Sequence, residues 1–155
     1  MRIHIIAIGA RMPAWIEAGY EEYARRLPRE CTLVLHEIPA RRRAKGADIS
    51  RLIAQEGARQ WATVPSGARV IALDRAGRKL DTEALATEIK KRLASGENLA
   101  FLIGGPEGLA PQCLQSAHDR WSLSELTLAH TVVRVLLAEQ LYRAWSIIRN
   151  LPYHR

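Results

Sequence analysis

The stretch NLAFLIGGPEG at residues 98–108 decides the fold. Its first six residues form a short apolar run, which predicts a strand, and the sequence GGPEG closes that strand. The three glycines, Gly104, Gly105 and Gly108, allow positive φ and a close approach of the backbone to a ligand, while the proline stiffens the loop. The same composition is also typical of a plain turn, so this loop alone does not establish a binding site.

Further strands and helices alternate on both sides of this stretch. Strands are predicted at residues 2–9, 31–38 and 69–73, with a brief one at 121–123. Helices are predicted at 13–27, 47–62, 81–94, 111–118 and 129–150, and the segment 74–79 is predicted to be a turn around Gly77. The run 31–38 is apolar on both faces, as a covered parallel sheet requires. The alternation predicts a single α/β domain over residues 1–155, built on a parallel sheet with helices on both faces.

Length and composition exclude several classes of protein. The 155 residues are 48% hydrophobic and 25% charged, which is typical of a globular domain. No apolar run approaches the roughly 18 residues of a membrane span, and we expect no signal peptide. The two cysteines, Cys31 and Cys113, have no metal-spaced neighbours, so we expect buried, reduced thiols in a cytoplasmic protein.

The charge is strongly positive. Lys and Arg number 23 against 16 Asp and Glu, which gives a net charge of +7, and 19 of the 23 cations are arginines. Arginine suits phosphates, so this balance favours a nucleic acid or another anionic partner. A genome rich in arginine codons would give the same bias. A basic loop concentrates the charge at Arg41, Arg42, Arg43 and Lys45, with Arg2 and Arg11 as possible additions; the alternative is a solvated loop.

Three loops follow strands and are candidates for a ligand site, because ligands of open α/β sheets bind at the carboxyl ends of strands. They are residues 74–79, 104–110 and 124–128. The run LSELTL at 123–128 could wall a flat aromatic ring with its leucines, although it could equally be a short buried strand. The glycine loop has neither Walker nor dinucleotide spacing, and the chain carries no hydrolase or metal motif.

The last predicted helix is apolar over an arc of roughly 200°, more than one covered sheet needs. We therefore expect a homodimer with this helix in the interface; the alternative is a centrally buried helix in a monomer. His130 and Arg134 point into the arc. Glu139 and Arg143 lie on the opposite stripe, where they could be only an exposed ion pair. The tail Tyr153-His154-Arg155 could stack on a base and bind phosphate, or it could be a frayed end.

Several of these segments together resemble one known family. They are IAIGARMPAW at 6–15, EIPA at 37–40, LIGGPEGL at 102–109, WSLSELTLAH at 121–130, VRVLLAEQLYRAW at 133–145 and the terminal PYHR. The chain resembles, along its whole length, the ribosomal large subunit pseudouridine methyltransferase H family of the SPOUT superfamily. Two departures are Thr131, where the family pattern has proline, and Leu151, where it has histidine.

The resemblance implies a C-terminal trefoil knot, a homodimer and S-adenosylmethionine as cofactor. It implies methylation of N3 of pseudouridine 1915 in helix 69 of 23S rRNA, with the assembled 70S ribosome as substrate. The cofactor contacts carried over are Leu73, Gly104, Gly105, Leu123, Ser124, Glu125, Leu126, Thr127 and Leu128, with Gly108 allowing close approach of the chain.

Catalytic roles follow from the same resemblance. His130 is the first candidate for a base that removes the N3 proton, before Glu139 and His154. Arg134 or Arg143 would stabilise charge on the target base, and Tyr153, His154 and Arg155 would come from the partner subunit. Two other functions stay open from the sequence: a ribosome-docking protein without chemistry, and a SPOUT methyltransferase acting on another RNA such as tRNA.

Overall fold

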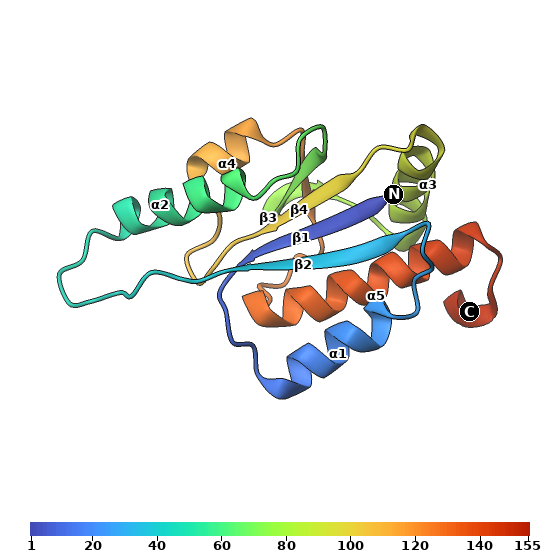
Figure 1. Cartoon of the computed structure of the whole chain (residues 1–155), viewed down its shortest axis with the longest axis horizontal. Helices are drawn as coiled ribbons and strands as arrows, with labels where there is room; N and C mark the ends of the chain where they lie inside the picture. The colour runs from blue at the N-terminus through green and yellow to red at the C-terminus, as the bar shows by residue number, and fades with distance from the viewer.

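The computed structural model describes residues 1–155 and contains one sheet of five parallel strands (Figure 1). Their order in the sheet is β2-β1-β4-β3-β5. The strands are β1 (Arg2–Ile8), β2 (Thr32–Ile38), β3 (Arg69–Lys79), β4 (Leu99–Ile103) and β5 (Asp119–Ser122). Every neighbouring pair is parallel, so the α/β class and the parallel sheet predicted from the sequence are confirmed.

Helices connect the strands and cover both faces of the sheet. They are α1 (Ala14–Ala24), α2 (Ile49–Ala62), α3 (Thr82–Ser95), α4 (Pro111–Ser116) and α5 (His130–Ile148), followed by a 3₁₀ turn, η1 (Pro152–His154). Side-chain caps begin two of them: Asp48 accepts a hydrogen bond from the Arg51 amide, and Asp81 from the Ala84 amide. Gly96, in the left-handed conformation, ends α3. No helix is both long and apolar enough to cross a membrane.

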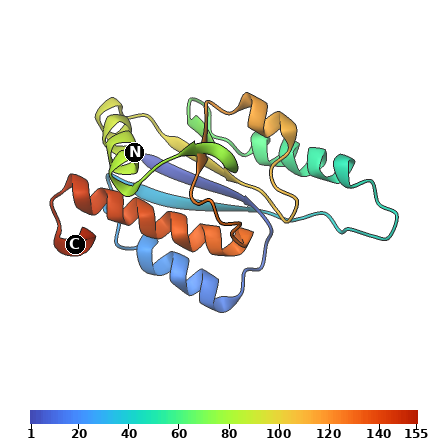
Figure 2. The same cartoon turned by 180° about the vertical axis from the view of Figure 1, so that it is seen from behind.

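The two faces of the sheet have separate apolar cores. On one face α5 lies along the sheet between α1 and α3 (Figure 2). The larger core lies here and includes Ile5, Phe101, Leu137 and Trp145. On the other face α2 and α4 pack over Ile6, Val70 and Leu102, and Cys113 belongs to this smaller core. Both cysteines are free and buried, as predicted, and burial raises the pKa of Cys31 to about 11.

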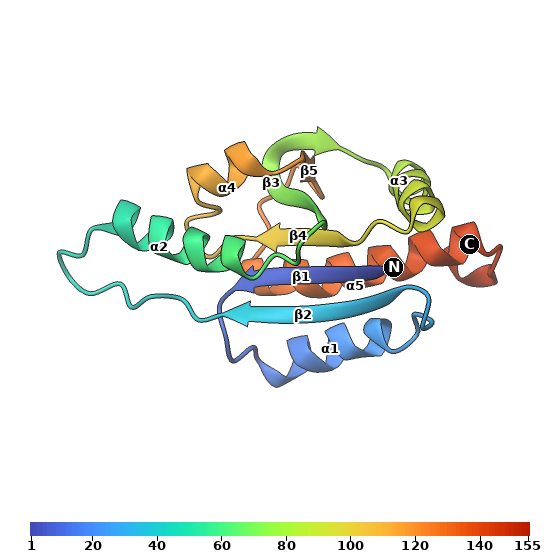
Figure 3. The same cartoon turned by 45° about the horizontal axis from the view of Figure 1, so that its top comes forward.

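The segment 74–79 is a continuation of β3 and not the predicted turn. The register of β3 against β5 shifts after Leu73, so that Trp121 pairs with both Leu73 and Arg78. Residues 73–78 thus curl around β5 (Figure 3). Gly77 permits this curl, because a Cβ there would lie 2.7 Å from the backbone carbon of Arg120. The glycine that suggested a turn serves instead as a point of close contact with the neighbouring strand.

The burial of α5 departs from a simple division into apolar and polar faces at two positions. The apolar Leu136 is 37% exposed, whereas the polar Ser146 is fully buried. The Ser146 hydroxyl donates to the Arg143 carbonyl one turn back at 2.7 Å, which satisfies it inside the protein. Arg134 does lie in the arc, where it is 1% exposed and has protein partners.

Candidate functional site

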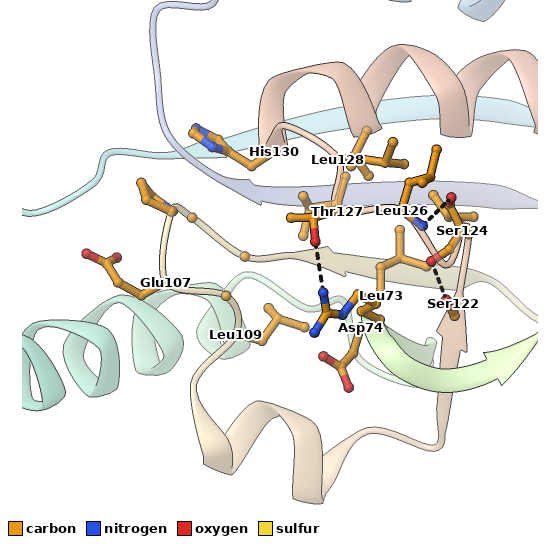
Figure 4. A pocket seen from close by; sticks show the side chains of 18 residues that line it. Leu73, Asp74, Glu107, Leu109, Ser122, Ser124, Leu126, Thr127, Leu128 and His130 are labelled. Carbon is orange, nitrogen blue, oxygen red and sulfur yellow. Dashed lines mark hydrogen bonds between the residues drawn. The ribbon is translucent and has the colours of Figure 1, made fainter.

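A pocket of about 470 Å³ opens at the carboxyl ends of β3 and β4 (Figure 4). The loop 104–109 forms one wall, and the segment 122–128 forms another. The first turn of α5, with His130 and Val133, closes it. All three segments that the sequence singled out contribute residues, although Asp74 and Arg75 belong to the extended strand β3 and not to a loop. The volume lies within the usual range for small-molecule sites.

The glycine loop is folded so tightly that Gly104 lies directly against the backbone of Gly108. A Cβ on Gly104 would lie 2.3 Å from the carbonyl carbon of Gly108, which is closer than any real contact. Gly105 is less restricted, since its Cβ would meet the Ile8 side chain at 3.1 Å. Gly108 has φ +83°, a conformation that favours glycine, and its amide donates to the Gly105 carbonyl. The loop is therefore a rigid wall that presents backbone to the pocket.

The opposite wall is held by polar contacts. The Ser122 hydroxyl donates to the Ser124 carbonyl at 3.0 Å, and the Ser124 hydroxyl accepts from the Leu126 amide at 2.9 Å. Across the pocket, Arg75 Nη1 donates to the Thr127 hydroxyl at 2.9 Å. Figure 4 shows these three bonds, with Leu126 and Leu128 beside them. This segment is a loop, so the alternative of a short buried strand is excluded beyond Ser122, where β5 ends.

His130 begins α5 at the rim of the pocket. A Cβ on Gly9, at the end of β1, would lie 3.7 Å from His130 Nε2, so the imidazole sits over a residue without a side chain. Burial, and then the neighbouring Arg134 guanidinium, lower the pKa of His130 below its ordinary value. The imidazole is therefore neutral near pH 7, and a neutral imidazole can accept a proton.

Arg134 fixes this corner of the site. Its Nη1 donates to Glu37 Oε2 at 2.9 Å, and its Nη2 donates to the Gly9 carbonyl at 2.6 Å and the Ile8 carbonyl at 3.3 Å. These contacts join α5 to the carboxyl ends of β1 and β2. Arg134 is thus occupied in holding the strand ends together under His130.

The other predicted catalytic residues lie elsewhere in the same chain. Arg143 is 13 residues beyond His130, roughly 20 Å along the helix. Arg143 donates to Glu139 Oε1 at 2.6 Å, and the Tyr153 hydroxyl donates to the same oxygen at 3.0 Å. Burial raises the pKa of the Tyr153 hydroxyl, and the neighbouring Tyr23 and Glu139 side chains raise it further. Glu139 and Arg143 are thus more than an exposed ion pair.

The tail is folded back and not frayed. The Tyr153 ring packs edge-on against Tyr142 at 4.7 Å between centroids, and the Arg143 guanidinium lies 4.8 Å from its centre. His154 and Arg155 follow at the surface. Within one chain, the structure therefore brings His130 to the pocket and leaves Tyr153, His154 and Arg155 at the far end of α5.

The basic loop between β2 and α2 projects from the body of the molecule (Figures 1 and 3). Arg41, Arg42 and Lys45 are exposed, and their side chains make no ion pair or hydrogen bond within the chain. Arg43 differs from them. It is bound by Glu56 and Glu107, so it is not a free cation as its place in the basic run suggested. Arg2 and Arg11 are exposed.

Several pocket residues were not predicted individually. They are Asp74, Arg75, Ile103, Pro106, Glu107, Leu109, Ser122 and Val133. Asp74 and Arg75 fell in a candidate loop, but a link from Arg75 to Thr127 spans 52 residues and leaves no local signal. Val133 is one turn after His130, so helical periodicity could have placed it beside the pocket.

The parallel α/β sheet carries its pocket, with a glycine loop and a leucine-rich wall, at the edge where proteins of this fold class bind their ligands. Two solved structures share the fold. A methylase family protein from Haemophilus influenzae matches with a TM-score of 0.56 and 16% identity, over 96% of this chain and 68% of that one. One from Neisseria gonorrhoeae matches with a TM-score of 0.52 and 11% identity, over 90% and 81%.

Sequence comparison is more specific. A family model described as Predicted SPOUT methyltransferase matches residues 1–154. The protein called Ribosomal RNA large subunit methyltransferase H of Thioalkalivibrio sulfidiphilus is 54% identical over 155 residues, covering 100% of this chain and 99% of that protein. Its namesake from Methylococcus capsulatus is 48% identical, with 100% of both chains covered. The chain belongs to the SPOUT methyltransferases and, within them, to the ribosomal RNA large subunit methyltransferase H family, which confirms the resemblance seen in its motifs.

Proposed function

We propose that this protein methylates N3 of pseudouridine 1915 in helix 69 of 23S rRNA, using S-adenosylmethionine, on assembled 70S ribosomes in the cytoplasm. The observation that carries the proposal is the 54% identity, over the full chain, to a ribosomal RNA large subunit methyltransferase H. The pocket supports it as well, because it contains the residues that the motifs assigned to the cofactor, with the exception of Glu125, which is 75% exposed and paired with Lys79. Leu73, Gly104, Gly105 and most of the segment 123–128 line it.

The residues of the pocket fit the proposed cofactor. Leu73, Leu126 and Leu128 offer apolar contacts for a flat adenine ring, and the backbone of 123–128 offers polar groups to the ring edge. On the other wall Gly104, Gly105 and Gly108 line the pocket, and their backbone can contact the amino-acid part. When bound, S-adenosylmethionine supplies an activated methyl group on a sulfonium.

The protein's part in the reaction is orientation and proton removal. N3 of pseudouridine carries a proton that must leave when the methyl group bonds to that nitrogen. We assign its removal to His130, which is neutral near pH 7 and stands at the rim of the pocket. Arg134 is 1% exposed and committed to Glu37 and to the ends of β1, whereas the Arg143 side chain, although paired with Glu139, is 29% exposed, so we assign stabilisation of charge on the target base to Arg143.

Arg143 and the tail can reach such a base only from a second copy of the chain. Arg143 lies roughly 20 Å along α5 from His130, and the tail packs beside it against Tyr142, in the second half of the helix. The outer face of α5 exposes Leu136 between His130 and Arg143. Two α5 helices packed antiparallel across this face would place Arg143, Tyr153, His154 and Arg155 of one subunit next to the pocket of the other. We therefore include a homodimer with a composite site in the proposal.

A trefoil knot completes the proposed architecture. The pairing of Trp121 with both Leu73 and Arg78 supports it, because residues 73–78 then encircle the chain just before it enters the pocket wall. The contact of Gly77 with the backbone of Arg120 and Trp121 closes this crossing. Arg41, Arg42 and Lys45, which are exposed and unpaired, would bind ribosomal phosphates without sequence specificity.

The test is methyl transfer from radiolabelled S-adenosylmethionine. The purified protein is offered 70S ribosomes, free 23S rRNA and bulk tRNA from cells that lack the enzyme. Label at N3 of pseudouridine 1915, in intact ribosomes only, is the expected result. Label in tRNA would identify a SPOUT methyltransferase with another substrate. Absence of both label and cofactor binding would leave a ribosome-docking protein without chemistry.

A further inference from the structure

Arg43 occupies a different environment from the other cations of the basic loop. Its side chain is 22% exposed and lies between two carboxylates. One belongs to Glu56 on α2, whose side chain is 4% exposed, and the other to Glu107 in the GGPEG loop of the pocket. Arg43 therefore connects the basic loop, helix α2 and the glycine loop.

Every N–H donor of the Arg43 guanidinium is used inside the protein. Nη1 donates to Glu56 Oε1 and, at 2.6 Å, to the Arg41 carbonyl. Nη2 donates to Glu56 Oε2 at 3.1 Å and to Glu107 Oε2 at 2.8 Å, while Nε donates to Glu107 Oε1 at 3.3 Å. A guanidinium has five N–H donors, and these five bonds leave none for an RNA phosphate.

The supports behind Arg43 are rigid. Glu56 also accepts a hydrogen bond from the Arg41 amide at 2.7 Å. One turn further along α2, Gln60 is fully buried and its Nε2 donates to the carbonyls of Ile6 at 2.7 Å and Ile103 at 3.0 Å. The helix that holds Arg43 is thus fastened to β1 and to β4, the strand from which the glycine loop departs.

We infer that Arg43 is a positioning residue of the cofactor pocket, which holds the GGPEG loop through Glu107, and that it is not a phosphate contact. This inference rests on the proposed function. Glu107 lines the pocket and stands on the same side of the view as His130 in Figure 4. Its pair with Arg43 adds a side-chain anchor in the middle of the loop, beside the local backbone bond from the Gly108 amide to the Gly105 carbonyl at 3.0 Å. The Arg43 guanidinium lowers the pKa of Glu107, so the pair stays charged at neutral pH.

The experiment compares Arg43→Gln with Arg42→Gln, a matched change at an exposed neighbour. Calorimetry measures the Kd for S-adenosylmethionine without ribosomes, and filter binding measures the salt dependence of 70S ribosome binding. For Arg43→Gln we expect the cofactor Kd to rise about tenfold, because charge-assisted bonds that shape the pocket are lost. The slope of log affinity for ribosomes against log salt concentration, the salt slope, should be the same for Arg43→Gln as for the wild type. Arg42→Gln should leave the cofactor Kd unchanged and reduce the salt slope by about 1.

A second variant separates positioning from general damage to the fold. Glu107→Gln keeps the buried pair of Arg43 with Glu56 and changes a side chain that is 34% exposed. It should weaken cofactor binding as Arg43→Gln does, and the double variant should be no weaker than Arg43→Gln alone, because both changes break the same link. Additive losses would contradict action through Glu107.

Other outcomes would overturn the inference. If Arg43→Gln binds the cofactor as the wild type does and loses salt slope instead, Arg43 is a phosphate contact. If the wild type itself binds no S-adenosylmethionine, the proposed function fails, and this inference fails with it. The calorimetric arm distinguishes these cases, since it needs no RNA substrate.

Discussion

Arg134 donates a hydrogen bond of 2.9 Å to Glu37 and thereby joins the first turns of α5 to the end of β2. Its Nη2 binds the Gly9 carbonyl at the end of β1 in the same way. A single buried guanidinium thus ties three elements that are far apart in sequence, at the edge of the sheet where the pocket opens. The relative positions of α5, β1 and β2 at the pocket therefore depend on this one side chain.

Replacing Arg134 should therefore destabilise the protein strongly. We expect Arg134→Met to lower the free energy of unfolding by about 3 kcal/mol, because two strand-end carbonyls and Glu37 lose their partner. Arg149→Met is the matched control at the C-cap of α5, where an exposed pair with Glu30 at 3.4 Å should contribute less than about 0.5 kcal/mol. Urea denaturation measures both. Equal losses would show that Arg134 is not a special support.

The two neighbouring glycines of the loop should respond differently to alanine. Gly104→Ala would put a Cβ 2.3 Å from the Gly108 backbone, which cannot move aside, so the loop must reopen. We expect loss of S-adenosylmethionine binding by more than about tenfold. Gly105→Ala meets only the Ile8 side chain at 3.1 Å, which can shift, so its Kd should change by less than about threefold. Calorimetric titration of both variants tests this order, and a reversed order would contradict the packing.

Much of this fold could be predicted from local pattern. The strands β1, β2 and β4 and all the helices follow from apolar periodicity and from Gly and Pro at their ends. The extension of β3 through 74–79 could not be predicted, because it depends on pairing with Trp121, more than 40 residues later. The sequence alone does not show whether Gly77 forms a turn or allows a close contact between strands.

The site followed the same division. The loops 104–110 and 124–128 could be placed at the pocket because parallel strands put their carboxyl ends together, whereas 74–79 reaches it as part of β3. The partners of Arg43 and Arg134 could not, since Glu107 and Glu37 lie 64 and 97 residues away. In the sequence, Arg43 cannot be distinguished from the other cations of the basic loop. Only its contacts in the folded chain distinguish it from Arg42.

The pH dependence of methylation should report the neutral form of His130. A base must be unprotonated to act, and burial and Arg134 lower the pKa of His130. The neutral form therefore persists to lower pH than in a free histidine, and the acid limb of kcat/KM should have an apparent pKa below about 6.5. His130→Ala should reduce the rate by about 100-fold or more and remove this limb. A limb that survives in His130→Ala at saturating substrates would assign the base to another residue.

The outer face of α5 should carry the dimer contact. Leu136 is 37% exposed on this face, and Ile49, 36% exposed on α2 at the other side of the sheet, is a matched control. We expect the wild type to sediment at twice the 17.4 kDa chain mass at micromolar concentration. Leu136→Asp should sediment as a single chain, because a carboxylate in an apolar contact is costly, whereas Ile49→Asp should stay dimeric. A wild type that is monomeric would remove the homodimer.

A mixed dimer tests whether the tail completes the partner's site. His130→Ala and Tyr153→Ala should each be inactive alone, since each lacks one half of every composite site. When the two chains are co-expressed, random pairing makes half of the dimers mixed, and each mixed dimer holds one site with both His130 and Tyr153 intact. Methylation should therefore return to about a quarter of the wild-type rate, given the two-fold symmetry of the dimer. If both groups instead acted within one chain, neither chain would hold a complete set, and no mixture could recover activity. Recovery thus depends on the separation within one chain, because Tyr153 packs against Arg143, which lies roughly 20 Å along α5 from His130.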